Sequence, residues 1–311
     1  MTIIDKMRLV YNNETFCKFL LVLTAIVWGS SYFLIKDIIQ IIDVGWLLAI
    51  RFLMSSAFLF LIAYKKILAH LDYDTIILGV ILGAFGFGGY LAQNVGLIFT
   101  TPGKNAFLTG TFAVIVPFVA WAAGMGRPER NNVVGAILAV LGLGFVALDS
   151  SSTGFNIGDA LTLVCACFYA MQTVEVAKRG SGINIVCVTF WEMLVMGLLY
   201  LGYALVVDDL PQLSKLTPNN YLVLFYLSII CSFLVLMFCN HAYTKVNPSA
   251  GAVLSSLESP FGVAFSVAFG YEVLTARLLC GFALILIGVI FSEAGPSIVQ
   301  YFQKTSLKSK G

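Results

Sequence analysis

Charged side chains are scarce in this chain of 311 residues, where Asp, Glu, Lys and Arg together make up 11%. Soluble domains average roughly 25%. Hydrophobic residues make up 59%, and the mean hydropathy is +0.94. This composition excludes an ordinary soluble domain and fits a polytopic helical membrane protein. The net charge of +2 gives no reason to expect a nucleic-acid partner.

Residue types that carry enzyme chemistry are equally few. The chain has two histidines, His70 and His241, and lacks a glycine-rich phosphate loop and a His-rich cluster. Its seven cysteines lie in or at the ends of apolar runs, where free cysteine behaves as a small hydrophobe. We therefore expect no catalytic residues, no metal and no cofactor, and ATP hydrolysis by this chain is excluded as a driving force. A channel is a competing function, and it would be expected to show rings of charge or a selectivity filter, usually formed by oligomerisation.

A cleavable signal peptide is also not predicted. Residues 1–15 are polar, the first apolar run is long, and no small-x-small site follows it. We expect the first apolar run to remain as a membrane helix.

Long apolar runs are abundant, and a run of about 20 such residues crosses the hydrocarbon core as a helix. Ten can be placed. They span residues 16–36, 44–64, 75–99, 104–124, 132–149, 157–178, 184–207, 219–243, 248–270 and 276–294. The predicted fold is an all-α integral membrane bundle with a tail at 1–15, five-helix repeats at 16–149 and 156–294, and a basic tail at 295–311.

Orientation follows from the cations, which short cytoplasmic loops retain. With the N-terminus inside, the tails and even-numbered connections hold 13 of the 18 Lys and Arg residues. Lys36, Lys104, Lys215 and Arg277 then fall outside, and Arg51 lies within a helix. Both termini are therefore predicted to be cytoplasmic.

The two halves repeat one another. Arg51 corresponds to Glu192 and Gly142 to Gly288, with a nearly constant separation along the chain between the members of each pair. Because five is odd, the second five-helix block enters the membrane from the opposite side. Such an inverted-topology repeat is typical of secondary transporters.

These repeated motifs resemble the EamA family of the drug/metabolite transporter (DMT) superfamily over residues 16–293. The motifs are Trp28-Gly29-Ser30-Ser31, Arg51-Phe52-Leu53, Pro117-Phe118, Glu258-Ser259-Pro260, Gly270-Tyr271-Glu272 and the spacing from Gly281 to Gly288. The resemblance implies a ten-helix carrier with a central cavity between two halves, often exporting amino acids or other small metabolites. The acidic Glu192 departs from the family, where an uncharged or basic residue is common, and the family's breadth leaves the substrate open.

Among the ionisable residues within the predicted spans, three matter most, because charge inside the bilayer is costly without a partner or a watery cavity. Glu258 either lines the substrate path, binding an amine or a proton, or braces the helix break at Pro260. Arg51 either binds a substrate carboxylate or forms a structural pair. Glu192 belongs to the opposite gate or pairs with a cytoplasmic cation. Glu192 and Glu258 are the coupling candidates.

Polar and aromatic side chains supply the remaining candidates. They place hydrogen-bonding groups in otherwise aliphatic helices and would build a cavity for a small amphiphile, or else form interfacial belts and interhelical bonds. The predicted substrate-binding residues are Tyr32, Arg51, Tyr90, Asn94, Gln172, Trp191 and Glu258.

Two prolines, Pro117 and Pro260, take matching places in the predicted fourth and ninth spans. Interior proline removes a backbone hydrogen bond. They are predicted to be paired kinks or hinges, although they could simply shape the helices around a cavity.

Together these features predict a plasma-membrane secondary transporter that moves a small organic metabolite by alternating access. An amino acid or related amphiphile, moved outward, is the favoured cargo. A lipid flippase on the same fold is the alternative, with an integral-membrane enzyme less favoured. The expected partners are a small-molecule substrate, membrane lipids and protons as a coupling ion, and the expected state is a monomer or weak homodimer.

Overall fold

The computed structural model describes residues 13–128, 130–147, 155–211, 213–277, 279–288 and 290–291, and within these ranges it contains helices and no strand. The predicted C-terminal tail and most of the N-terminal tail lie outside the described residues. Eight segments are long and apolar enough to cross a membrane.

Four of these segments lie in each half of the chain. The first four are α2 (Glu14–Gly29) with α3 (Ser31–Ile38), α4 (Val44–Ala69), α5 (Tyr73–Phe99), and α6 (Pro102–Thr109) with α7 (Phe112–Ala122). The other four are α9 (Ile157–Arg179), α10 (Ile185–Val207), α11 (Pro218–Phe225) with η2 (Tyr226–Leu234) and α12 (Val235–Tyr243), and α13 (Pro248–Ser256) with α14 (Glu258–Ala268). A short 3₁₀ turn, η1 (Leu213–Lys215), precedes α11.

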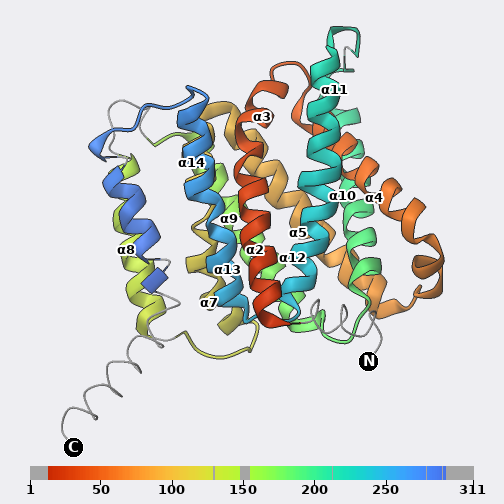
Figure 1. Ribbon diagram of the computed structural model, residues 1–311, viewed down its shortest axis with the longest axis horizontal. Coiled ribbons are helices and arrows are strands. Elements are labelled where there is room, and N and C mark those ends of the chain that lie inside the picture. Colours follow the sequence, from red (N-terminus) through yellow and green to blue (C-terminus); the bar gives the residue numbers. More distant parts are fainter. Residues whose placement is uncertain are drawn as a thin grey trace, which may run out of the picture.

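Shorter apolar helices occupy the fifth and tenth predicted spans. They are Val133–Gly142, within α8 (Arg130–Ala147), and Leu279–Gly288. The two lie side by side at the left of Figure 1. The chain is therefore an all-helical, multi-pass protein with eight long apolar helices in its described part.

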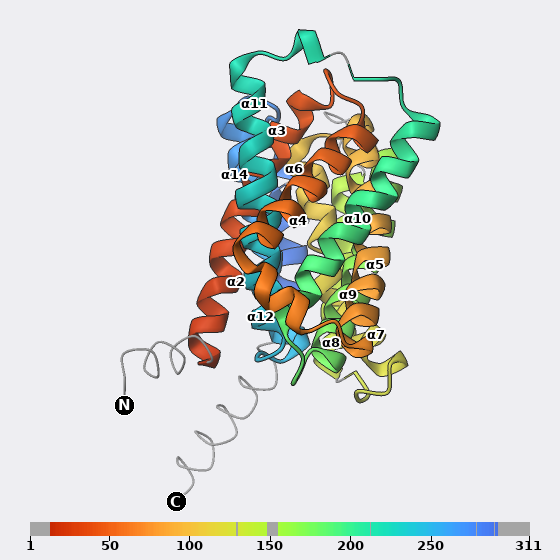
Figure 2. The same cartoon turned by 90° about the vertical axis from the view of Figure 1, so that its right-hand side faces the viewer.

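The two halves interlock. The most extensive packing joins α5 to α9, α10 to both α4 and α5, and α14 to both α6 and α2. Figure 2 shows α4 and α10 crossing in front of the bundle. Each of these contacts pairs a helix before residue 148 with one after residue 155. A rigid movement of one whole half against the other would break most of this packing.

The positions where helices start and break show which residues of the two repeats correspond, and they do so more consistently than Pro117 and Pro260. Pro102 and Pro248 each begin a helix, where their missing N–H costs nothing. At the same separation along the chain, the break at Thr111 before α7 corresponds to the break at Leu257 before α14. Pro117 is therefore interior to α7, whereas Pro260 lies in the first turn of α14. These two prolines do not occupy equivalent positions.

Glycines bring α8 and Leu279–Gly288 into backbone contact. A Cβ on Gly142 would lie 2.7 Å from the carbonyl oxygen of Gly281, and a Cβ on Gly288 would lie 2.6 Å from that of Gly135. Gly142 corresponds to Gly288 and Gly281 to Gly135 in the two repeats, so the two contacts are equivalent. Small residues permit this approach where apolar burial alone provides no attraction between helices.

Candidate functional site

A cavity lies between helices of both halves. Among its lining residues are six of the seven predicted substrate-binding residues: Tyr32, Arg51, Tyr90, Asn94, Gln172 and Glu258. Further side chains on its wall include Trp28, Gln93, Asn105, Tyr169, Asn240 and Tyr243. The cavity volume is about 60 Å³, and one water needs roughly 10–15 Å³ of such space. A few waters or a small organic molecule therefore fit.

Glu258 is the first residue of α14, directly after the break at Leu257. It is 5% exposed, and the Tyr32 hydroxyl donates to its Oε1 at 3.3 Å. Gln93 Nε2 donates to that hydroxyl at 2.9 Å, and Tyr169 donates to Gln93 Oε1 at 3.0 Å. A chain of hydrogen bonds thus ends at a buried carboxylate, which forms no ion pair with a described lysine or arginine.

Arg51 contributes the opposite charge. Its side chain, 1% exposed, donates from Nε and Nη2 to Ser232 Oγ at 3.3 and 3.1 Å. Ser232 lies on the π-helical segment η2, and such segments frequently mark functional sites. The guanidinium also lies 5.7 Å from the ring centre of Tyr90. Its Nη1 has no hydrogen-bond partner among the described residues, so a buried donor is available to an anionic group.

Two asparagines on the wall have free acceptors. Asn94 donates from Nδ2 to the Tyr90 carbonyl at 2.7 Å, and Asn105 donates to the Gln93 carbonyl and to Thr162 Oγ1 at 3.1 and 2.8 Å. In the described part of the chain, neither Oδ1 atom has a partner. Leaving such atoms buried costs about 1–3 kcal/mol each, so the wall is suited to a ligand that donates hydrogen bonds.

Glu192 lies immediately behind the cavity wall. It is fully buried, and its two oxygens accept hydrogen bonds from Gln172 Nε2 at 2.6 Å and from Asn240 Nδ2. Both donors line the cavity, whereas Glu192 does not. The structure therefore attaches this coupling candidate to the site through two amides.

Three other predicted residues lie away from the cavity. Trp191 packs against the core around Phe190, 5.3 Å between ring centres, and its indole nitrogen has no described partner. Pro117 and Pro260 shape α7 and α14 without lining the cavity. Within the described residues, no group of three or more His, Cys, Asp or Glu side chains could hold a metal ion.

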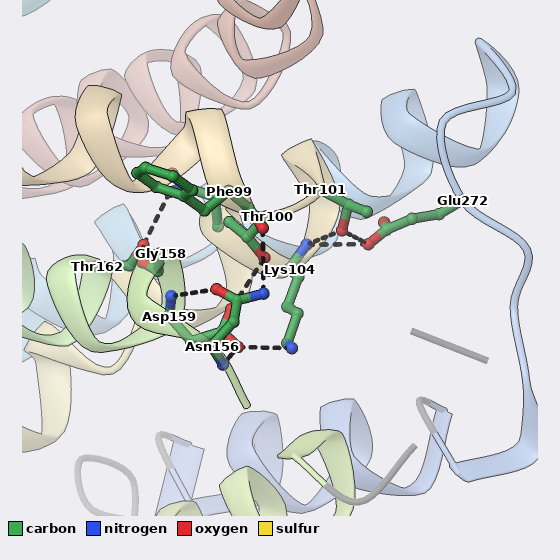
Figure 3. Close-up of polar contacts among 10 residues, drawn as sticks. Phe99, Thr100, Thr101, Lys104, Asn156, Gly158, Asp159, Thr162 and Glu272 are labelled. Carbon is green, nitrogen blue, oxygen red and sulfur yellow. Dashed lines mark hydrogen bonds and ion pairs between the residues drawn. The ribbon is translucent and has the colours of Figure 1, made fainter. Parts of the chain in front are cut away.

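The sequence reasoning missed a buried ion pair between Lys104 and Asp159 (Figure 3). Lys104 was expected in an external loop, but it lies within α6 and is 2% exposed. Its Nζ is 2.6 Å from Asp159 Oδ2, and Thr100 donates to Asp159 Oδ1 at 2.8 Å. The Thr-Pro helix start at Thr101 could have revealed that the span begins before Lys104.

Glu272 binds the first turn of α6 from the segment after α14 (Figure 3). Its Oε1 accepts from Thr101 Oγ1 and from the backbone N–H of Lys104 at 3.1 Å. A Cβ on Gly103 would collide with Oε2, so only glycine allows this approach. Burial raises the pKa of the Glu272 carboxyl above its ordinary value. The helix N-terminus is thus held by a carboxylate from the other half.

The fold and cavity define the class: a multi-pass helical membrane protein with a buried polar site between its helices. Its sequence matches the profile of the EamA-like transporter family twice, over residues 15–148 and 156–293. The chain belongs to this family of transporters, which confirms the resemblance drawn from its motifs.

Individual relatives agree with this assignment. A protein of Archaeoglobus fulgidus named "Uncharacterized transporter" is 30% identical over 272 residues, covering 87% of this chain and 83% of the relative. A second protein of that name and organism is 26% identical over 262 residues, covering 79% and 86%. A solved structure titled "Crystal structure of protein" superposes with a TM-score of 0.66 at 18% identity, covering 89% of this chain and 96% of that one, and supports the fold alone.

Proposed function

We propose that this transporter is a secondary carrier that moves a small organic metabolite, an amino acid or related amphiphile, outward across the plasma membrane by alternating access. The observation that carries this proposal is the pairing of Arg51 and Glu258 on one cavity. Among the described residues, Arg51 has a guanidinium nitrogen without a partner, and the Glu258 carboxylate accepts a single 3.3 Å hydrogen bond. A molecule with an anionic group and a protonated amine complements both.

The cavity walls support a small amphiphilic substrate. Trp28, Tyr90 and Tyr169 provide aromatic surface beside the buried polar groups. The buried polar side chains of Arg51 and Glu258 also line this cavity. This favours a metabolite over the flippase alternative.

An arrangement of ten helices in two inverted repeats is part of the proposal. It is supported by the reciprocal glycine contacts and by the start of α9, where Asn156 Nδ2 donates to the Phe99 carbonyl. Lys36, at the end of α3, donates to the neighbouring Thr100 carbonyl at 2.9 Å. The α2–α3 helix therefore finishes at the end of the bundle where α9 begins. Both chain termini are proposed to be cytoplasmic.

Glu258 is proposed as the residue that couples transport to protons. Its position at the break between α13 and α14 places a titratable group where a small rotation of α14 changes its surroundings. Its hydrogen-bond donor, Tyr32, comes from α3. Protonation would weaken the Tyr32 bond, because a neutral carboxyl accepts less strongly than a carboxylate, and would bias the two helices toward a different arrangement.

The test is uptake of labelled amino acids and aromatic metabolites into liposomes containing the purified protein, with and without a pH gradient. We expect saturable uptake that responds to the gradient, and loss of that response in Glu258→Gln. Glu175→Gln is the matched control, because Glu175 pairs with Arg179 on α9 away from the cavity. Uptake indifferent to both the gradient and Glu258→Gln would indicate a facilitative carrier, and no uptake of any solute would favour a lipid flippase.

A further inference from the structure

Glu192 occupies an unusual position for a membrane carboxylate. It lies on α10, is fully buried, and forms no ion pair with a described lysine or arginine. Its hydrogen bonds instead come from two neutral amides, Gln172 on α9 and Asn240 on α12. A buried charge is costly. We therefore look to its contacts with Gln172 and Asn240 for a role that a neutral residue at position 192 could not fill.

Each amide has a donor end and an acceptor end, and an ionised carboxylate can only accept. Glu192 therefore requires the NH₂ ends of both Gln172 and Asn240 to turn toward it. Each NH₂ group makes a second hydrogen bond that is consistent with this orientation. Gln172 Nε2 also donates to the Leu82 carbonyl at 3.4 Å, and Asn240 Nδ2 donates to Thr189 Oγ1 at 3.0 Å. The carbonyl ends remain for the cavity that both residues line.

The same orientation recurs on the rest of the wall. Asn94 and Asn105 also direct their NH₂ groups into the protein and leave their Oδ1 atoms without a described partner. Gln93 differs, because its oxygen accepts from Tyr169 and its nitrogen donates to Tyr32. Four of the five amides on the cavity wall thus donate to groups within the protein, and their oxygens accept no hydrogen bond from a described residue.

We propose that Glu192 is a positioning residue that orients Gln172 and Asn240 as hydrogen-bond acceptors, so that the cavity selects substrates carrying a donor group, such as a protonated amine. This inference rests on the proposed function, because it adds two oriented acceptors for the amine that Glu258 binds in the same cavity. Glutamine at position 192 could donate as well as accept, so it would let either amide rotate. A site whose acceptors are fixed rejects an analogue that lacks the donor.

The experiment measures binding, so it does not depend on transport. Purified protein in detergent is titrated with L-leucine and with 4-methylpentanoate, which lacks only the amine, and thermal stabilisation gives each dissociation constant. We expect at least about tenfold tighter binding of leucine by the wild type, the size of one hydrogen bond to a charged group. In Glu192→Gln this ratio should fall at least about threefold, the size of a modest hydrogen bond, and keep the share that Glu258 contributes, while Glu192→Asp should retain most of it.

A matched control and a second pair of variants separate positioning from packing. Met193→Leu changes an equally buried neighbour on α10 and should keep the ratio. Gln172→Leu with Asn240→Leu should lower the ratio at least as far as Glu192→Gln does, and adding Glu192→Gln should then change nothing more. If Glu192→Gln does not fold, the ratio in the Gln172→Leu, Asn240→Leu double variant still tests whether the two amides select for the amine.

Three results would overturn the inference: equal binding of the two ligands by the wild type, an unchanged ratio in Glu192→Gln, or an unchanged ratio in the double leucine variant. The proposed function fails separately. Selective binding with no movement of leucine into liposomes would reject transport and leave the role of Glu192 intact.

Discussion

Arg51 and Lys104 are both buried cations of the first half, 1% and 2% exposed, yet their surroundings differ. Lys104 faces Asp159 at 2.6 Å, away from the cavity lining. Arg51 faces the cavity, donates to Ser232, and forms no ion pair with a described carboxylate. A buried charge requires compensation. Lys104 obtains it from the protein, whereas we propose that Arg51 obtains it from a ligand.

The largest expected effect comes from breaking the compensated pair. Lys104→Met leaves Asp159 buried without its cation, and should lower the free energy of unfolding by about 3–5 kcal/mol. Thermal unfolding of the purified protein in detergent measures this change. The double variant with Asp159→Asn should recover most of the loss, because no unpaired charge remains. Equal destabilisation in the single and double variants would show that packing of the Lys104 chain matters more than its charge.

Removing Arg51, which forms no ion pair with a described carboxylate, should affect ligand binding more than stability. Arg51→Met should leave thermal stability unchanged or higher, and should weaken binding of carboxylate-bearing solutes at least about tenfold, since a hydrogen bond to a charged group contributes roughly 1.5–3 kcal/mol. Arg51→Lys keeps the charge without the planar fork and should fall between. If Arg51→Met destabilises the protein as much as Lys104→Met does, the two cations are both structural.

The smallest effect concerns Glu272, which bonds the backbone N–H of Lys104. Because burial raises its pKa from the ordinary 4.5, the folded protein retains this proton to a higher pH than the unfolded chain does. Stability should therefore fall as pH rises from 4.5 through the raised pKa. Glu272→Gln should remove this part of the pH dependence, as measured by thermal unfolding across that range. A profile that matches the wild type would mean that Glu272 ionises without cost.

Much of this protein could be predicted from composition and periodicity. The long apolar runs indicate the eight long helices, and six of seven binding candidates line one cavity because polar side chains within a membrane helix must face protein or water. Trp191 lies outside this cavity, and an indole can equally well pack in a core. The sequence cannot tell these two environments apart when a single aromatic residue is considered.

Contacts between distant segments were beyond the sequence. Lys104 and Asp159 are far apart along the chain, and each lies at the edge of an apolar run where a solvated charge is the ordinary interpretation. The interlocking of α9 and α10 with α5 likewise depends on helix packing, which a pattern of apolar residues does not specify. Pro117 and Pro260 hold similar places in their spans, which suggested that they are equivalent. The matching helix starts and breaks of the two repeats, however, lie slightly farther apart along the chain than these two prolines do.

The glycine contacts between α8 and Leu279–Gly288 have a mechanical consequence. Where Gly142 meets Gly281 and Gly288 meets Gly135, one backbone lies against the other, with Ile285 and Leu138 beside the contacts. A side chain at Gly142 or Gly288 would push the two helices apart, so the spacing of this helix pair depends on both glycines. Because the two contacts are copies of each other, a substitution at either glycine should separate the helices to a similar extent.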